Sequence, residues 1–262
     1  MAIIAYNYKM KSQVNIEAIK AFLPVNEPFT REVVRGFFAR KGEELTEENL
    51  KVRVNRLKSK GVIVNVGRGW YKINNKKIFE PKISTSLKKL ITSVKKGFPF
   101  LNYVLWSTAW LNELATLQLF RNVFIIEVEA GSEEAIFSTV KESFPFKTFL
   151  DPNENEWSNY MAEREENIII KTMVSESPKE NYNGIKIARL EKILVDLYCD
   201  KLWKTIFSAE LKNMYTEACT NYVLNFSTLL SYSARRGKRE EIWNYIKALE
   251  VLDKSTIDLI ER

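Results

Sequence analysis

The residues of this chain best suited to chemistry are the cations of one short stretch, residues 51–79. This stretch contains nine Lys or Arg and no Asp or Glu. Such a run attracts a polyanion, and the backbone of a nucleic acid is one. The nine residues are Lys51, Arg53, Arg56, Lys58, Lys60, Arg68, Lys72, Lys76 and Lys77. Most charged runs are only solvated surfaces. The elements that carry these cations therefore decide between a solvated surface and a surface that binds nucleic acid.

Residues 46–60 have the spacing of one amphipathic helix. Leu50, Val54 and Leu57 recur at intervals of four and three, which gives a single apolar stripe. Thr46 can cap the first turn, and Gly61 can end the helix. The remaining faces present groups that suit base edges and phosphates. From them we predict DNA contacts by Lys51, Val52, Asn55, Arg56, Lys58 and Ser59.

A β-hairpin is predicted directly after this helix. Residues 62–66 alternate in the period of a strand, and the glycines of Gly67-Arg68-Gly69 allow a tight turn. Arg68 then lies at the tip, where it can enter a minor groove or touch the DNA backbone. The returning strand adds Trp70 and Lys72 to the predicted contacts.

Two helices are predicted before the basic one, at residues 12–23 and 31–41, with Thr30 as the cap of the second. Three helices followed by a hairpin is the order of a winged helix-turn-helix, in which the third helix enters the major groove. We therefore predict that residues 1–80 form a DNA-binding domain of this class.

The charge distribution supports a division into two domains. Residues 1–80 contain 16 Lys or Arg and 8 Asp or Glu, whereas residues 81–262 contain 24 and 25. The basic excess therefore belongs to the N-terminal third of the chain, and the partner domain is nearly neutral.

Alternating strands and helices are predicted for residues 81–174, and mostly helices for residues 175–262. The fold class is therefore α+β, with a mixed sheet in the second domain. We predict strands at residues 103–106, 122–128, 147–150 and 167–173. Helices are predicted at residues 84–96, 110–119, 132–144, 190–198, 208–222, 226–235 and 239–249, and a loop at residues 175–184.

Composition excludes several classes of site. The chain has no histidine, which removes histidine triads and histidine metal ligands. Its two cysteines, Cys199 and Cys219, are predicted to be buried free thiols. We expect no metal and no cofactor. No apolar run is long enough to cross a membrane, so a cytoplasmic protein without a membrane partner is expected.

Carboxylates are the only candidates for catalysis. Glu127 and Glu129 alternate on one predicted strand, as in a metal-dependent nuclease, and Lys171 lies on another. Lys192 and Asp196 are four residues apart on a helix and can simply pair with each other. Because no complete catalytic motif is present, we expect the protein not to be an enzyme.

Four segments resemble the AbiEi-type antitoxin family of type IV (abortive-infection) toxin–antitoxin systems. They are RVNRLKSKGVIVNVGRGWYKI, FPFLNYVLWSTAWLNEL, LEKILVDLY and SARRG, at residues 53–73, 98–114, 190–198 and 233–237. The resemblance extends over nearly the whole chain.

The resemblance implies a transcriptional autorepressor that binds inverted repeats in its own promoter, as a monomer in solution or a cooperative pair on DNA. The C-terminal domain would counter a nucleotidyltransferase toxin, without a stable complex between the two. Two alternatives remain open. One is a nuclease or nucleotidyltransferase recruited to nucleic acid by its winged helix. The other is a one-component regulator whose second domain senses a ligand.

Overall fold

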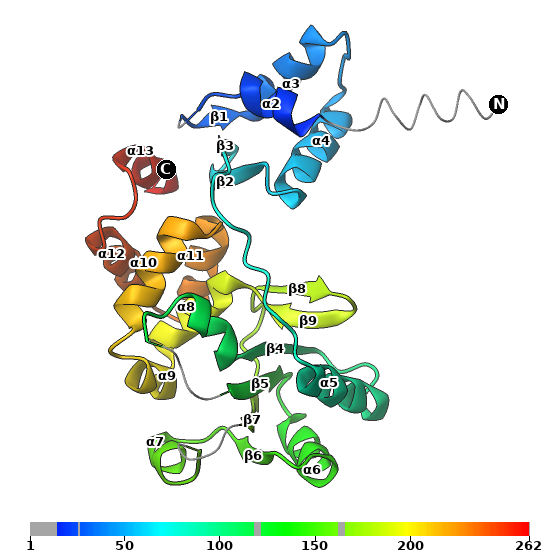
Figure 1. Ribbon diagram of the computed structural model, residues 1–262, viewed down its shortest axis with the longest axis vertical. Coiled ribbons are helices and arrows are strands. Elements are labelled where there is room, and N and C mark those ends of the chain that lie inside the picture. Colours follow the sequence, from blue (N-terminus) through cyan, green and yellow to red (C-terminus); the bar gives the residue numbers. More distant parts are fainter. Residues whose placement is uncertain (1–14, 26, 118–121, 162–165, 262) are drawn as a thin grey trace, which may run out of the picture. The chain divides into compact units, whose positions relative to one another are not determined.

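The computed structural model describes residues 15–25, 27–117, 122–161 and 166–261 (Figure 1). Its contacts divide the chain into two units. The N-terminal unit comprises residues 1–78 and 253–262, and the C-terminal unit comprises residues 79–252. The domain boundary predicted from the sequence lies after residue 80, with residues 253–262 in the second domain. The structure instead places these last ten residues in the N-terminal unit.

In the part that the structure describes, the N-terminal unit combines four helices with a three-stranded antiparallel sheet of order β1-β3-β2 (Figure 1). The helices are α2 (Ile16–Phe22), α3 (Arg31–Arg40), α4 (Glu47–Ser59) and α13 (Lys254–Glu261), and the strands are β1 (Phe29–Thr30), β2 (Ile63–Gly67) and β3 (Trp70–Ile73). The three predicted helices and the hairpin are confirmed, although residues 12–14 of the first helix lie outside the described residues. Strand β1 and helix α13 were not predicted.

The core of this unit lies between α2, α3, α4 and the sheet. The three apolar residues predicted for α4 are all buried there, together with Val34 of α3. Thr46 caps α4 by accepting a hydrogen bond from the Asn49 N–H at 3.3 Å. Thr30 precedes α3 but makes no such bond. Thr30 thus occupies the predicted N-cap position, where its backbone also pairs with β3, but its side chain makes no capping hydrogen bond.

Helix α13 packs on strand β2 of the same unit. Its buried side chains are Thr256 and Leu259. The approach is close at Gly67, where an added Cβ would lie 2.8 Å from the Leu259 carbonyl oxygen. A residue without a side chain is therefore required at this end of β2.

The C-terminal unit is built on a six-stranded mixed sheet of order β6-β7-β5-β4-β9-β8. Strands β5, β6 and β7 are mutually parallel where they pair, β4 is antiparallel to β5, and β9 is parallel to β4. The strands are β4 (Tyr103–Ser107), β5 (Asn122–Val128), β6 (Lys147–Leu150), β7 (Glu166–Thr172), β8 (Lys179–Tyr182) and β9 (Ile185–Ala188). The predicted mixed sheet is thus confirmed.

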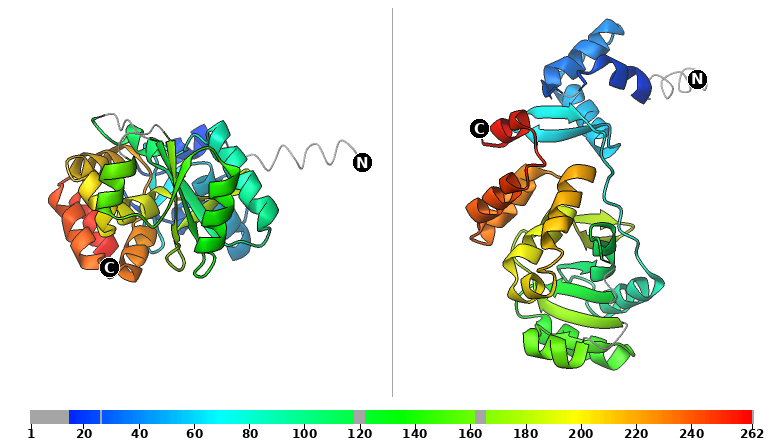
Figure 2. Two further views of the ribbon diagram at one scale, coloured as in Figure 1. Left: turned by 90° about the horizontal axis from the view of Figure 1, so that it is seen from below. Right: turned by 60° about the vertical axis from the view of Figure 1, so that its left-hand side comes forward.

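Helices cover both faces of this sheet (Figures 1 and 2). One face is covered by α5 (Thr85–Gly97) and α6 (Glu133–Ser143), and the other by the helices that follow β9. The latter are α8 (Leu190–Cys199), α9 (Lys201–Ile206), α10 (Leu211–Asn221), α11 (Phe226–Arg235) and α12 (Arg239–Ala248). A short helix α7 (Glu154–Glu156) continues into a π-helical turn, η2 (Trp157–Met161).

Two predicted elements differ in this unit. The helix expected at residues 110–119 is a 3₁₀ helix, η1 (Thr108–Glu113), and residues 118–119 lie outside the described part. Here Ser107 accepts from the Ala109 N–H at 3.2 Å and Thr108 from the Val123 N–H at 2.9 Å. Such side-chain bonds compete with helical ones.

The second difference is the loop expected at residues 175–184, which contains strand β8 of a hairpin with β9. Asn183 and Gly184 form its two-residue turn, and both have positive φ. This is the Asn-Gly turn that favours a tight hairpin.

Over the described residues, no helix combines the length and apolarity needed to span a membrane.

Candidate functional site

Helix α4 presents a polar and basic surface on the side away from the core of the N-terminal unit. Leu50, Val54 and Leu57 are buried, so the side chains on the opposite side of the helix face solvent. Val52 is 59% exposed, which is unusual for a large apolar side chain and leaves it open to contact a partner. Every predicted contact residue of α4 is exposed: Lys51, Val52, Asn55, Arg56, Lys58 and Ser59.

Ion pairs fix the angle between α3 and α4. Glu47, in the first turn of α4, pairs with Arg31 at 3.2 Å and also with Arg35. Arg35 donates a further bond to the Leu45 carbonyl at 2.8 Å. The pKa of Arg35 is raised by its hydrogen bond to Glu32 and by the two carboxylates around it. These contacts hold α4 in a set orientation beneath α3.

Arg53, one of the nine cations of residues 51–79, has a structural position. Its guanidinium lies over the Phe38 ring, 5.1 Å from the centroid, and pairs with Glu43 at 3.4 Å. The side chain is only 18% exposed. It therefore belongs to the packing of α4 against α3.

The hairpin β2–β3 carries the remaining predicted contacts. Arg68 is exposed at its tip, and Gly69 beside it has a φ of +79°. Trp70 is half-buried. Lys72 was predicted to contact DNA. Its ammonium instead binds Asp253 and the Thr256 hydroxyl of α13, each at 3.0 Å. The exposed basic part of the hairpin is thus its tip.

The Lys72–Asp253 pair makes the docking of α13 depend on pH. Burial acts to raise the pKa of Asp253, but hydrogen bonds from Ser255, Lys72 and Thr256 outweigh it and hold the pKa well below its usual range. The carboxylate therefore stabilises the fold above about pH 4, and this contribution is lost as the pH falls through the lowered pKa.

We expect Asp253→Asn to cost about 1 kcal/mol at pH 7, after allowance for the exposure of the carboxylate. The difference in stability between this variant and the parent protein should shrink as the pH falls below about 4. Hydrogen exchange of the amides of residues 254–261 would measure it, with the exposed Asp258→Asn on the same helix as the control. Equal exchange in the parent and Asp253→Asn at pH 7 would contradict this role.

A buried charge network lies between β5 and α8 in the C-terminal unit. The Lys192 ammonium is fully buried, 2.6 Å from Glu127 and 2.5 Å from Asp196. Tyr232 donates to the same Asp196 at 2.9 Å, and the Trp106 indole donates to Glu127 at 3.1 Å. The predicted pairing of Lys192 with Asp196 is confirmed, with Glu127 as a third member.

Burial is the largest single influence on the pKa of Glu127, Lys192 and Tyr232 in this network. It raises the pKa of Glu127, against the attraction of Lys192. It acts to lower the pKa of Lys192, but Asp196 and Glu127 outweigh it, so this pKa is raised. For Tyr232, burial and the charge of Asp196 raise the pKa. Lys192 is therefore a fixed cation that neutralises buried carboxylates.

The acidic pair considered for metal-dependent catalysis is not assembled as an open site. Glu127 is buried and already accepts bonds from Lys192 and Trp106. Glu129 is exposed, lies beyond the end of β5, and approaches the Asn102 N–H at 3.5 Å. Among the residues that the structure describes, no group of three Cys, Asp or Glu is arranged to hold a metal ion.

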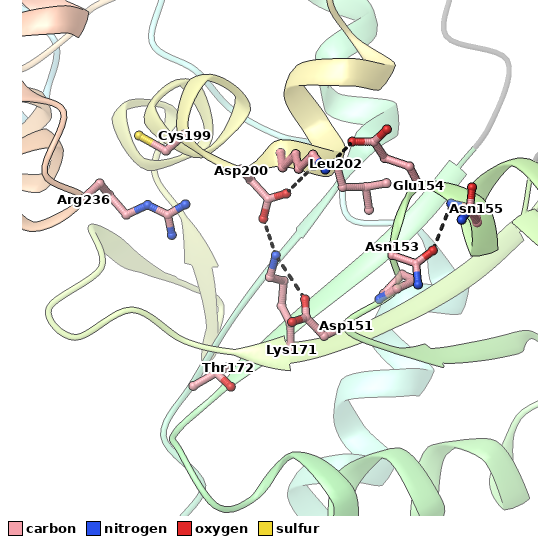
Figure 3. A pocket seen from close by; sticks show the side chains of 12 residues that line it. Asp151, Asn153, Glu154, Asn155, Lys171, Thr172, Cys199, Asp200, Leu202 and Arg236 are labelled. Carbon is pink, nitrogen blue, oxygen red and sulfur yellow. Dashed lines mark hydrogen bonds and ion pairs between the residues drawn. The ribbon is translucent and has the colours of Figure 1, made fainter.

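A polar pocket of about 600 Å³ lies at the ends of β6 and β7 (Figure 3). Lys171 projects into it and pairs with Asp200 and, at 3.6 Å, with Asp151. Burial acts to lower the pKa of Lys171, but Asp200 outweighs it and the pKa is raised. The lining comprises Asp151, Pro152, Asn153, Glu154, Asn155, Lys171, Thr172, Cys199, Asp200, Lys201, Leu202 and Arg236.

Arg236 connects this pocket with the buried network. Its guanidinium lies 3.7 Å from Asp196, and Arg236 lines the pocket together with Cys199. Burial raises the pKa of the Cys199 thiol. The prediction that both cysteines are buried holds for Cys219, whereas Cys199 is half-buried at the pocket wall.

Residues 49–251 match a family of unknown function, DUF6577. The chain belongs to this family. No curated protein and no solved structure shows a significant match to it. The DUF6577 region begins within α4 and includes the hairpin, the buried network and the whole pocket. It does not extend to α2, α3 or α13.

The exposed face of α4 in this DUF6577 chain was predictable from the sequence, but the pocket was not. The pocket combines residues 151–155, 171–172, 199–202 and 236, which are far apart in the sequence. One available signal was the position of polar residues directly after predicted strands, as at Asp151. In an α/β sheet such ends are where ligands bind.

Proposed function

We propose that the N-terminal unit is a winged helix-turn-helix domain that binds duplex DNA. In this assignment α4 enters the major groove and the hairpin β2–β3 is the wing. The observation that carries the proposal is the exposed, acid-free face of α4 at residues 51–59, followed at once by a hairpin with Arg68 at its tip. The order of three helices with β1 paired to the hairpin further supports it.

Electrostatics favours the same partner. Residues 1–78 and 253–262 together contain 18 Lys or Arg and 10 Asp or Glu, whereas residues 79–252 contain 22 and 23. A unit with a net charge of +8 attracts the phosphate backbone, and its affinity should fall with salt. Asn55 and Arg56 can read base edges, and Lys58 can position the helix on phosphates.

The biological role that we propose is that of a cytoplasmic autorepressor and antitoxin. It rests on the resemblance to AbiEi-type antitoxins in the four segments quoted above. The DNA partner would be inverted repeats in the protein's own promoter, bound by a cooperative pair. The functional partner would be a nucleotidyltransferase toxin. The enzymatic alternative is less well supported because Glu127 is already neutralised by Lys192.

A gel-shift titration tests this proposal directly. The full-length protein is titrated against its own upstream DNA and against scrambled DNA of equal length, at two salt concentrations. We expect binding to the upstream DNA to be at least about 10³-fold tighter. Equal and strongly salt-sensitive binding to both DNAs would reduce the basic face to a non-specific electrostatic surface and would overturn the repressor role.

A further inference from the structure

The pocket of the C-terminal unit lies where an α/β sheet ordinarily binds a ligand. Asp151 directly follows β6, and Lys171 and Thr172 end β7, which is parallel to β6. The carboxyl ends of parallel strands are the usual position of ligands in such sheets. Residues 199–202, where α8 ends and α9 begins, form the facing wall. A volume of about 600 Å³ is that of a small-molecule site.

The inner part of the pocket carries two held cations. The side chains of Lys171 and Arg236 are 18% and 20% exposed, respectively. Figure 3 shows the Arg236 guanidinium pointing into the space beside Lys171 and Asp200. Asp200, which itself lines the pocket, orients Lys171, and Asp196, which does not line it, orients Arg236.

The two carboxylates that hold these cations, Asp200 and Asp196, also accept hydrogen bonds from other groups. Asp200 caps α9 by accepting from the Leu202 N–H at 3.0 Å. Asp196 accepts from Lys192 and Tyr232, both closer than Arg236 at 3.7 Å. Arg236 therefore keeps N–H groups for a closer acceptor, and a guanidinium binds phosphate or carboxylate oxygens in a two-bond fork.

The mouth of the pocket has the opposite character. Asp151 and Glu154 are 72% and 40% exposed at the side-chain level, and the amides of Asn153 and Asn155 lie beside them. Glu154 and the Asn155 amide carbonyl can accept hydrogen bonds from hydroxyl and amino groups. The Asn153 carbonyl already caps α7 by accepting from the Asn155 and Glu156 N–H groups, so Asn153 offers its amide N–H groups as donors. Inner cations with outer acceptors match a ligand that has an anionic head and a donor-rich body.

We propose that this pocket binds a small phosphorylated ligand of the size of a mononucleotide. The phosphate lies between Arg236 and Lys171, and the sugar hydroxyls and base face Glu154, Asn153 and Asn155. Asp151 competes with the phosphate for Lys171, because the two bind the same ammonium. The site is separate from the proposed DNA-binding surface and does not depend on it.

Calorimetric titration of the full-length protein tests the proposal. The probes are the four common nucleoside 5′-monophosphates, the matching nucleosides and inorganic phosphate. We expect at least one monophosphate to bind, and its nucleoside to bind at least about tenfold more weakly, because it lacks the charge-assisted bonds. Absence of binding by all four monophosphates at millimolar concentration would overturn the proposal, as would equal binding of nucleoside and monophosphate.

Two variants with opposite expected effects locate the site. Arg236→Gln should weaken monophosphate binding by about tenfold or more, because a charged donor is lost. Asp151→Asn should strengthen it several-fold, because a competing charge is removed. Asn tolerates the positive φ of 41° at this position. Unchanged affinity in both variants would place the ligand elsewhere and overturn the assignment.

The matched control is Arg235→Gln. Arg235 is adjacent in sequence, pairs with Glu176 at 3.2 Å and does not line the pocket. The Arg235→Gln variant should bind the monophosphate with the affinity of the parent protein. A loss of affinity equal to that of Arg236→Gln would contradict the site. Thermal unfolding of each variant establishes that it is folded. If Arg236→Gln does not fold, Asp151→Asn decides alone, because its expected gain cannot come from unfolding.

Discussion

Lys192→Met should destabilise the C-terminal unit by roughly 3–5 kcal/mol, because it leaves two buried carboxylates without their cation. Lys192 is fully buried and contacts both Glu127 and Asp196 within 2.6 Å. Urea unfolding followed by total tryptophan fluorescence would measure the loss, and one of the six tryptophans is Trp106, whose indole donates to Glu127. The raised pKa of Lys192 means that this stabilisation is present at neutral pH and is lost only at strongly alkaline pH.

Neutralising the carboxylates distinguishes charge from packing in this effect. Glu127→Gln with Asp196→Asn should recover much of the stability of Lys192→Met, since no buried charge then lacks a partner. Lys201→Met is the control, because that side chain is 92% exposed and should change stability by less than about 0.5 kcal/mol. A loss below about 1 kcal/mol in Lys192→Met would refute the importance of the network.

Loss of the side chains that we assign to base reading should have the second-largest effect. Asn55→Ala and Arg56→Ala should each weaken binding to the operator by about 1–3 kcal/mol, or roughly 5- to 150-fold, with little change on scrambled DNA. Both side chains are exposed on α4, so these substitutions should not impair folding. Gel-shift titrations on the two DNAs measure the change in preference.

Lys58→Ala provides the contrast within the same helix. As a phosphate contact it should weaken both DNAs alike and reduce the slope of log affinity against log salt by about one. If Asn55→Ala instead lowered affinity equally for operator and scrambled DNA, the assignment of base reading to this face of α4 would be wrong.

The N-terminal unit was largely predictable because its signals are local. The spacing of Leu50, Val54 and Leu57 specified the buried side of α4. Gly69 specified the hairpin turn, whereas Gly67 lies at the end of β2 and admits the close approach of α13. The position of Lys72 was not predictable, because its partner Asp253 is 181 residues away. Periodicity shows which side of a strand is buried, but not which distant segment covers it.

In the C-terminal unit the errors have the same physical origin. The η1 segment has apolar residues at helical spacing, yet Thr108 bonds the backbone of β5 and the α-helix does not form. The β8–β9 hairpin was missed because Pro and Asn suggested a loop, although Asn183-Gly184 is itself a hairpin signal. The pocket depends on the pairing of β6 with β7, which no local pattern specifies.

The return of α13 to the N-terminal unit affects the order in which the protein can mature. A ribosome makes residues 253–262 only after the whole C-terminal unit has been synthesised. The sheet that carries the hairpin therefore lacks its covering helix while the C-terminal unit is being made. A truncated chain that ends before Asp253 leaves Lys72 without this carboxylate and the Gly67 end of β2 uncovered. Completion of the N-terminal unit thus requires prior synthesis of the C-terminal unit.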